Sequence, residues 1–234
     1  MTTTALSTFT VGVTGHRPNR LVIREERVRW RLAQVLAALR TGTRARVLSR
    51  VAISALAEGA DRLFADAALE LGYRLDALLP FASADYETTF GDATTTPDYR
   101  SLLARMTIVQ ALPNTLADSK AAYEAAGRTI VERCDVLVAV WDGKPAAGRG
   151  GTPEIIEHAL ACGKPTIWID AARDRPPRLL RLPTAHGLRV VPLERLAGRA
   201  RALTARRIVK LASKARAAAP GSGRSPGTPA RPSG

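Results

Sequence analysis

The chain has 234 residues, 46% of them hydrophobic, and its 35 Lys and Arg against 21 Asp and Glu give a formal net charge of +14. This length fits one large domain better than two small ones. No apolar run approaches the ~20 residues of a membrane span, and residues 1–10 lack the basic and apolar segments of a secretory signal. We therefore expect a cytoplasmic protein that does not engage a membrane.

The positive charge is unevenly distributed along the chain. Residues 1–170 hold 20 basic and 19 acidic side chains, whereas residues 171–234 hold 15 and 2. An excess of cations is typical of nucleic-acid binding, although a solubilising or localising tail has the same composition. We expect nucleic acid as a partner only through this basic segment.

Between residues 8 and 170, short apolar segments alternate with amphipathic ones, which indicates strands and helices in turn. The expected strands are 9–14, 50–56, 73–79, 107–111, 135–141 and 166–169, and the expected helices are 25–39, 61–71, 98–106, 119–133 and 152–162. The alternation predicts an α/β fold, a three-layer Rossmann-like sandwich in which a mostly parallel sheet carries helices on both faces.

The flanking segments differ from this domain. Residues 1–7 are expected to be a flexible N-terminus, and residues 171–219 a basic extension. In the extension, we expect neither a helix nor a strand in the Arg- and Pro-rich stretch 173–183. Residues 186–193 are expected to form an edge strand, and residues 193–218 a helix. Residues 220–234 consist mainly of Gly, Pro, Ser and Arg, which predicts a disordered tail.

Cysteine and histidine usage excludes several kinds of site. Cys134 and Cys162 lie on different expected elements and lack a paired spacing, so no disulfide framework is indicated. No two histidines have the spacing of a metal site. We predict neither a metal nor a cofactor.

Ligands of an open parallel sheet bind beyond the carboxyl ends of its strands, and the first such loop contains Gly15, His16 and Arg17. Gly15 allows a tight turn or a positive φ and lets backbone amides approach a phosphate, on which Arg17 could place two hydrogen bonds. A plain glycine turn with a solvated arginine is the alternative, and both interpretations stay open.

The second loop contains Glu58, Gly59, Ala60 and Asp61. Gly59 and Ala60 leave the start of the next helix open to a ligand. Asp61 can cap that helix or accept a ribose hydroxyl, and the two roles are compatible.

The third loop covers residues 141–154 and ends in Gly150, Gly151, Thr152, Pro153 and Glu154. Thr152 is a suitable cap and Pro153 suits the first helical position, so the glycines before them leave a bare helix start that attracts anions. Glu154 can complement the helix dipole, or it can point at a ribose, because an acid beside a phosphate would repel it.

Aromatic residues gather after the third strand and at the third loop. Phe81, Tyr86 and Phe90, together with Asp85, could form a lid over a base or could pack beneath a long loop. Either Tyr86 or Trp141 is expected to border the base of a nucleotide.

Three motifs carry a family resemblance: Thr14-Gly15-His16-Arg17, Glu58-Gly59-Ala60-Asp61 and Gly150-Gly151-Thr152-Pro153-Glu154. Residues 8–170 resemble the SLOG superfamily of Rossmann-like nucleotide-binding proteins, which includes the Lonely Guy phosphoribohydrolases, the DNA-processing Smf proteins and sensor domains of bacterial defence systems. The resemblance implies a nucleotide-like ligand across the strand ends, with its phosphate on the 150–152 turn.

The resemblance to the phosphoribohydrolases is incomplete. Their motif is Pro-Gly-Gly-x-Gly-Thr-x-x-Glu, whereas here the leading Pro is missing and Glu154 follows Thr152 by two positions instead of three. The arrangement Gly-Gly-Thr-x-Glu also looks like nucleoside deoxyribosyltransferases, in which a loop-borne Glu attacks the sugar.

Three functions follow from these motifs. The preferred one is a domain that binds, and so senses, a nucleotide-derived small molecule; signalling through a homo-oligomer is compatible with it. The second is cleavage or transfer at an N-glycosidic bond, with Glu154 as the catalytic carboxylate, and the third is a nucleic-acid binder of the DNA-processing kind. The expected ligand-binding residues are Gly15, His16, Arg17, Glu58, Gly59, Ala60, Asp61, Tyr86, Trp141, Asp142, Gly150, Gly151 and Thr152.

Overall fold

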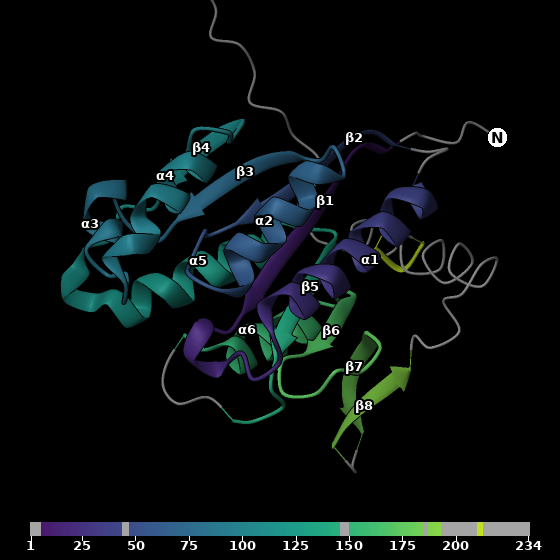
Figure 1. The fold of residues 1–234 in the computed structure, drawn as a ribbon. Helices are drawn as coiled ribbons and strands as arrows, with labels where there is room; N and C mark the ends of the chain where they lie inside the picture. The colour runs from purple at the N-terminus through teal and green to yellow at the C-terminus, as the bar shows by residue number, and fades with distance from the viewer. Residues whose placement is uncertain (1–5, 44–46, 146–149, 185–186, 193–209, 213–234) are drawn as a thin grey trace, which may run out of the picture.

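The computed structural model describes residues 6–43, 47–145, 150–184, 187–192 and 210–212. Its strands form one sheet in the order β4-β3-β2-β1-β5-β6-β7-β8 (Figure 1). The strands are β1 (Leu6–Gly15), β2 (Val47–Ser54), β3 (Arg74–Leu79), β4 (Ile108–Ala111), β5 (Val136–Trp141), β6 (Thr166–Asp170), β7 (Arg178–Thr184) and β8 (Gly187–Pro192). The helices are α1 (Glu25–Thr43), α2 (Ala60–Glu70), α3 (Ser83–Glu87), α4 (Thr96–Leu103), α5 (Ser119–Arg133) and α6 (Thr152–Ala161).

Strands β1 to β6 are parallel, and β7 and β8 join antiparallel at one edge. The chain first builds outward from β1 through β2 and β3 to β4, and then continues on the other side of β1 with β5 and β6. The order therefore reverses between β1 and β5, where loops from both halves of the sheet diverge. Such a reversal is the usual ligand site of open α/β sheets.

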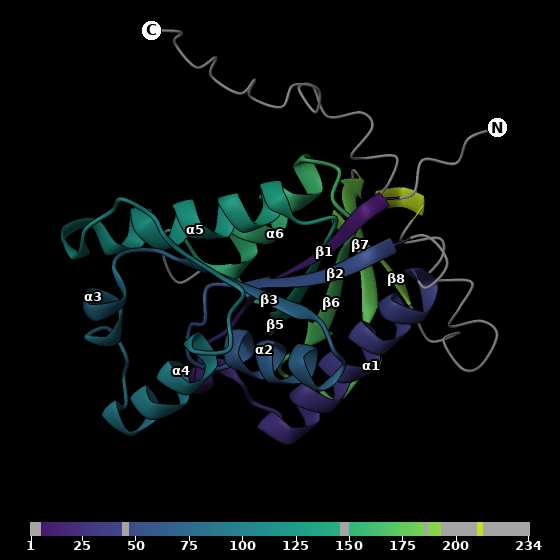
Figure 2. The same cartoon turned by 90° about the horizontal axis from the view of Figure 1, so that it is seen from above.

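Helices cover both faces of the sheet, as Figure 2 shows: α5 and α6 lie on one face, and α1 and α2 on the other. All six residues of β5 are buried, as expected for a central strand covered on both sides. One core cluster joins Leu32 of α1 and Phe64 of α2 to β1, and a second joins Ile130 of α5 and Ile155 of α6 to β5. The predicted three-layer Rossmann-like sandwich is confirmed.

Most expected elements occur with boundaries shifted by a few residues, and α5 has the expected limits. The irregular stretch between β3 and β4 contains a short helix, α3, that the sequence pattern does not predict. The expected strand at 50–56 ends at Ser54, because Leu56 adopts a φ of 57° in the following turn. Residues 6 and 7, expected to be flexible, lie in β1.

The C-terminal extension adds two strands to the sheet where the sequence predicts one. The expected edge strand corresponds to β8, whereas β7 lies largely within the stretch 173–183, for which the sequence predicts neither a helix nor a strand. Leu179 and Leu180 of β7 are buried against the domain. Of the expected helix at 193–218, the structure describes only residues 210–212, which are helical, and the expected tail at 220–234 lies outside the described residues. No helix among the described residues has both the length and the apolar character needed to cross a membrane.

Candidate functional site

A cavity of about 330 Å³ lies beyond the carboxyl ends of β1, β2 and β5. One wall is apolar and comes from α5 and α6, through Ala126, Gly127, Ile130 and Ile155. The polar lining residues come mainly from the three loops that the sequence singles out. The cavity therefore coincides with the reversal in strand order.

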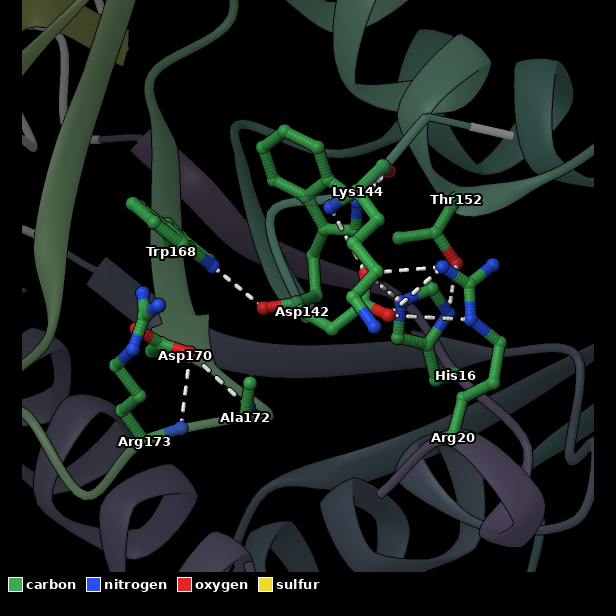
Figure 3. Close-up of polar contacts among 10 residues, drawn as sticks. His16, Arg20, Asp142, Lys144, Thr152, Trp168, Asp170, Ala172 and Arg173 are labelled. Carbon is green, nitrogen blue, oxygen red and sulfur yellow. Dashed lines mark hydrogen bonds and ion pairs between the residues drawn. The ribbon is translucent and has the colours of Figure 1, made fainter. Parts of the chain in front are cut away.

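His16 follows β1 and lies between Asp142 and Thr152 (Figure 3). Its Nε2 is 2.9 Å from Asp142 Oδ1, and its Nδ1 is 3.5 Å from Thr152 Oγ1. Burial lowers the pKa of His16, although the hydrogen bond with Asp142 acts in the opposite direction. A neutral ring at pH 7 donates from Nε2 to the carboxylate, which leaves Nδ1 to accept from the threonine hydroxyl.

Asp142 collects donors from three directions. Arg20 donates from Nη2 over 2.7 Å and from Nε over 3.2 Å, and the Lys144 amide donates over 3.0 Å. Burial alone would raise the pKa of Asp142, but the bonds from Lys144, His16 and Arg20 outweigh it and lower the pKa to about 2. Asp142 is therefore ionised and balances the charge of Arg20 at the cavity.

Arg17 crosses the polar side of the cavity. It donates from Nη1 to Glu58 Oε2 over 3.0 Å and to the Thr89 carbonyl over 3.2 Å, and from Nη2 to the Tyr123 hydroxyl over 3.3 Å. Its guanidinium also lies 5.7 Å from the centre of the Tyr123 ring. The side chain is thus held in place by groups from three separate segments of the chain.

Glu58 is buried and holds the segment after α3. Its carboxylate accepts from the Gly91 amide over 2.9 Å and from Thr95 Oγ1 over 3.0 Å, in addition to Arg17. Burial acts to raise the pKa of Glu58, but these hydrogen bonds lower it below its ordinary value. Glu58 is not among the described residues that line the cavity, so it acts on the site by positioning Arg17.

Asp61 lines the cavity and turns back toward β2. Its Oδ2 accepts from the Ala55 amide over 3.1 Å and from Ser54 Oγ over 3.3 Å. The N-cap of α2 is Gly59, which has no side-chain cap, so the expected capping role of Asp61 is wrong. Burial raises the pKa of Asp61 to about 6.

Close packing explains the glycines of the first two loops. A Cβ on Gly15 would lie 2.4 Å from the Cβ of Ala60, and Gly15 is the last residue of β1, not a residue with positive φ. Gly59 has a φ of 86°, and a Cβ there would lie 2.7 Å from the carbonyl oxygen of His16. The start of α2 therefore rests directly on the end of β1.

The turn before α6 is closed by an acidic side chain. Glu154 Oε2 accepts from the Gly150 amide over 2.7 Å, and Gly150 has a φ of 79°. Among the described residues, no carbonyl accepts from the amides of Gly151 and Thr152. Glu154 itself does not line the described part of the cavity, whereas Gly150, Gly151 and Thr152 do.

The expected aromatic residues fall into two groups. Phe81, Tyr86 and Phe90 pack in one cluster, with Tyr86 fully buried, as the packing interpretation of these residues expects. Trp141 packs on Trp168 at 5.5 Å, and its Nε1 donates to the Lys144 carbonyl over 2.8 Å. Tyr86 lines the cavity and Trp141 does not.

Arg20 and Tyr123 are among the lining residues that lie outside the expected set. Arg20 is close to His16 in sequence, and its position in the same loop was a usable signal. Tyr123 lies inside α5, and no sequence pattern distinguishes it from other helix residues. Within the described parts of the chain, no group of three or more His, Cys, Asp or Glu residues could hold a metal ion.

Comparison with known proteins gives structural similarity only. No protein-family model and no curated protein matches the sequence. The X-ray structure of DNA processing protein A (DprA) from Streptococcus pneumoniae is 17% identical, with a TM-score of 0.48; the match covers 69% of this chain and 50% of that one. The structural-genomics target TM1055 is also 17% identical, with a TM-score of 0.42, and covers 68% of this chain and 72% of that one. These similarities concern the fold alone, and the Rossmann-like architecture rests on the strand order of the sheet itself.

Proposed function

We propose that the chain binds a nucleotide or a nucleotide-derived small molecule in the cavity, and that it serves as a ligand-binding, sensor-type domain. The observation that carries the proposal is the convergence of cationic, polar and apolar groups in one cavity at the reversal of strand order. A mostly apolar cavity of a few hundred Å³ with a small number of placed polar groups is the usual form of a small-molecule site.

The phosphate belongs on the turn before α6. The amides of Gly151 and Thr152 have no carbonyl partner among the described residues, and the positive end of the helix dipole adds to them. The Gly150 amide already donates to Glu154, so it is not part of the phosphate site. Arg17 and Arg20 line the same cavity and contribute positive charge.

Glycosidic cleavage by Glu154 has less support from the geometry. The carboxylate of Glu154 accepts from the Gly150 amide and does not line the described cavity, whereas such chemistry needs a carboxylate beside the sugar. We expect no release of free base from nucleoside monophosphates by the wild type or by Glu154→Gln. Release by the wild type that is lost in Glu154→Gln would favour the enzyme instead.

Thermal-shift measurements with a panel of nucleosides and nucleotides test the binding proposal. At least one nucleotide should raise the Tm of the wild type, and Gly151→Asp should abolish the rise, because its carboxylate would repel the phosphate. Ser101→Asp places the same charge on an exposed position of α4 and is the matched control. A panel without any shift would contradict the proposal, and an equal shift in Gly151→Asp would remove the phosphate from this turn.

A further inference from the structure

The hydroxyl of Tyr86 is a buried polar group without a hydrogen-bond partner among the described residues. The side chain is 0% exposed, and it lines the cavity. Buried hydroxyls are nearly always hydrogen-bonded, so an exception of this kind calls for a functional explanation. A cavity occupant can supply the missing partner.

The Tyr86 ring is held rigidly in position. Phe81, Phe90 and Tyr99 contact it edge to face, with ring centres 5.7, 5.2 and 5.9 Å away. The Tyr86 amide also donates to the Ala82 carbonyl over 2.9 Å. Because the ring cannot easily turn away, the hydroxyl is preorganised for a ligand.

The chemistry around Tyr86 differs from that around Thr152. Burial raises the pKa of Tyr86 well above its ordinary value, and the nearby Asp61 adds to the rise, so the hydroxyl stays a neutral donor. Asp61 also lines the cavity and repels anions, and its charge acts on Tyr86 more strongly than the opposing charge of Arg17. This part therefore suits a neutral oxygen of the ligand rather than its phosphate.

The sheet topology separates the two ends of the cavity. Tyr86 follows β3 and Thr152 follows β5, and β2 and β1 lie between these strands. The ends of β3 and β5 are three interstrand spacings apart, which is about 14 Å. A ligand that reaches both ends must therefore lie across the strand ends.

We infer that the end of the cavity at Tyr86 is the subsite for the nucleoside part of the ligand, where Tyr86 Oη donates to a neutral oxygen while the phosphate lies on the Gly151–Thr152 turn. The acceptor is a carbonyl of the base or a hydroxyl of the sugar. This inference rests on the proposed function and deepens it by fixing the orientation of the ligand. Tyr86 then recognises the ligand through its hydroxyl and does not act as a stacking lid.

Calorimetric titration of wild type, Tyr86→Phe and Tyr99→Phe with nucleoside monophosphates tests the inference. Tyr86→Phe should weaken binding about tenfold, since one hydrogen bond to the ligand is lost. Tyr99→Phe is the matched control, because Tyr99 belongs to the same aromatic cluster but its hydroxyl bonds Ser83 at 2.9 Å and it does not line the described cavity. Without ligand, Tyr86→Phe should keep or raise the Tm, because it removes an unpaired buried hydroxyl.

Ligand analogues identify the acceptor. If it is a base carbonyl, purine riboside monophosphate should bind wild type and Tyr86→Phe alike, while inosine monophosphate distinguishes them. If the acceptor is a sugar hydroxyl, wild type and Tyr86→Phe should bind the 2′-deoxy or the 3′-deoxy nucleotide with the same affinity.

Equal affinity of wild type and Tyr86→Phe for every bound nucleotide would overturn the inference and leave the proposed function intact. A lower Tm of ligand-free Tyr86→Phe with unchanged affinity would do the same. Absence of binding to the wild type would instead remove the proposed function.

Discussion

At the scale of single residues, the site depends on partners that lie far apart in the sequence. Asp142 bonds His16 across 126 positions, and Arg17 bonds Tyr123 across 106. The motifs identified His16, Arg17 and Asp142 as candidates because they follow strands, and the structure brings all three to the carboxyl edge of the sheet. Which donor meets which acceptor depends on side-chain packing, and the sequence pattern does not contain that information.

Asp61 should make stability depend on pH. Its pKa is raised from 3.8 to about 6 in the folded state, so it contributes stability that is fully present below 3.8 and is lost as pH rises through 6. Asp61→Asn keeps a side-chain oxygen acceptor and removes the buried charge. We expect the stability of Asp61→Asn relative to wild type to increase from pH 4 to pH 7 by an amount on the order of 3 kcal/mol. Urea unfolding across this pH range measures the difference, and a pH-independent difference would contradict it.

Gly15 should be intolerant of any side chain. A Cβ at this position would lie 2.4 Å from that of Ala60, so Gly15→Ala should destabilise the fold by about 1–3 kcal/mol through overpacking. Combining it with Ala60→Gly should restore part of the loss. Gly91→Ala is the control, because its Cβ would meet only Glu58 Oε2 at 3.9 Å. Equal denaturation midpoints for Gly15→Ala and Gly91→Ala would show that β1 and α2 are not in close contact.

At the scale of elements, the pattern of apolar residues predicts the strands that are buried on both faces of the sheet. It does not predict elements in segments that are rich in Arg and Pro or that are very short. The continuous apolar run of β5 and the capped, periodic sequence of α5 were predictable, and the structure confirms both. The sequence pattern does not predict β7, because Arg and Pro dominate its surroundings, although its Leu179 and Leu180 are buried. It does not predict α3 either, because a helix of five residues shows too little periodicity, and so it does not predict the environment of Tyr86.

Leu180 tests whether β7 is an integral part of the domain. It is 2% exposed and packs in a cluster with Trp141, Ile156 and Leu160. Leu180→Ala should therefore lower the free energy of unfolding by about 2–4 kcal/mol. Leu116→Ala, at a position that is 39% exposed, should cost less than about 1 kcal/mol. If Leu180→Ala were as mild as Leu116→Ala in chemical denaturation, the domain would end at β6, as composition alone predicted.

At the scale of the whole molecule, charge is divided between two regions. Among the described residues, the two arginines of the cavity are each paired with a carboxylate, Arg17 with Glu58 at 3.0 Å and Arg20 with Asp142 at 2.7 Å. Residues 1–170 are close to neutral, while residues 171–234 hold 15 basic and 2 acidic side chains. The net charge of +14 therefore says little about the cavity, for which we propose a small ligand with one phosphate and not a polyanion.

This division of charge predicts two different responses to salt. Binding of a nucleoside monophosphate in the cavity should weaken less than about tenfold between roughly 50 and 300 mM salt, because it neutralises only one or two charges. Binding of duplex DNA through the Arg-rich C-terminal segment would neutralise many phosphates and should weaken by at least about 1,000-fold over the same range. Fluorescence anisotropy of labelled nucleotide and labelled duplex measures both slopes on the full chain. Displacement of the labelled nucleotide by DNA at low salt in the wild type, together with weaker binding of the labelled duplex by Gly151→Asp, would instead place the nucleic acid in the cavity and contradict the separation of the two regions.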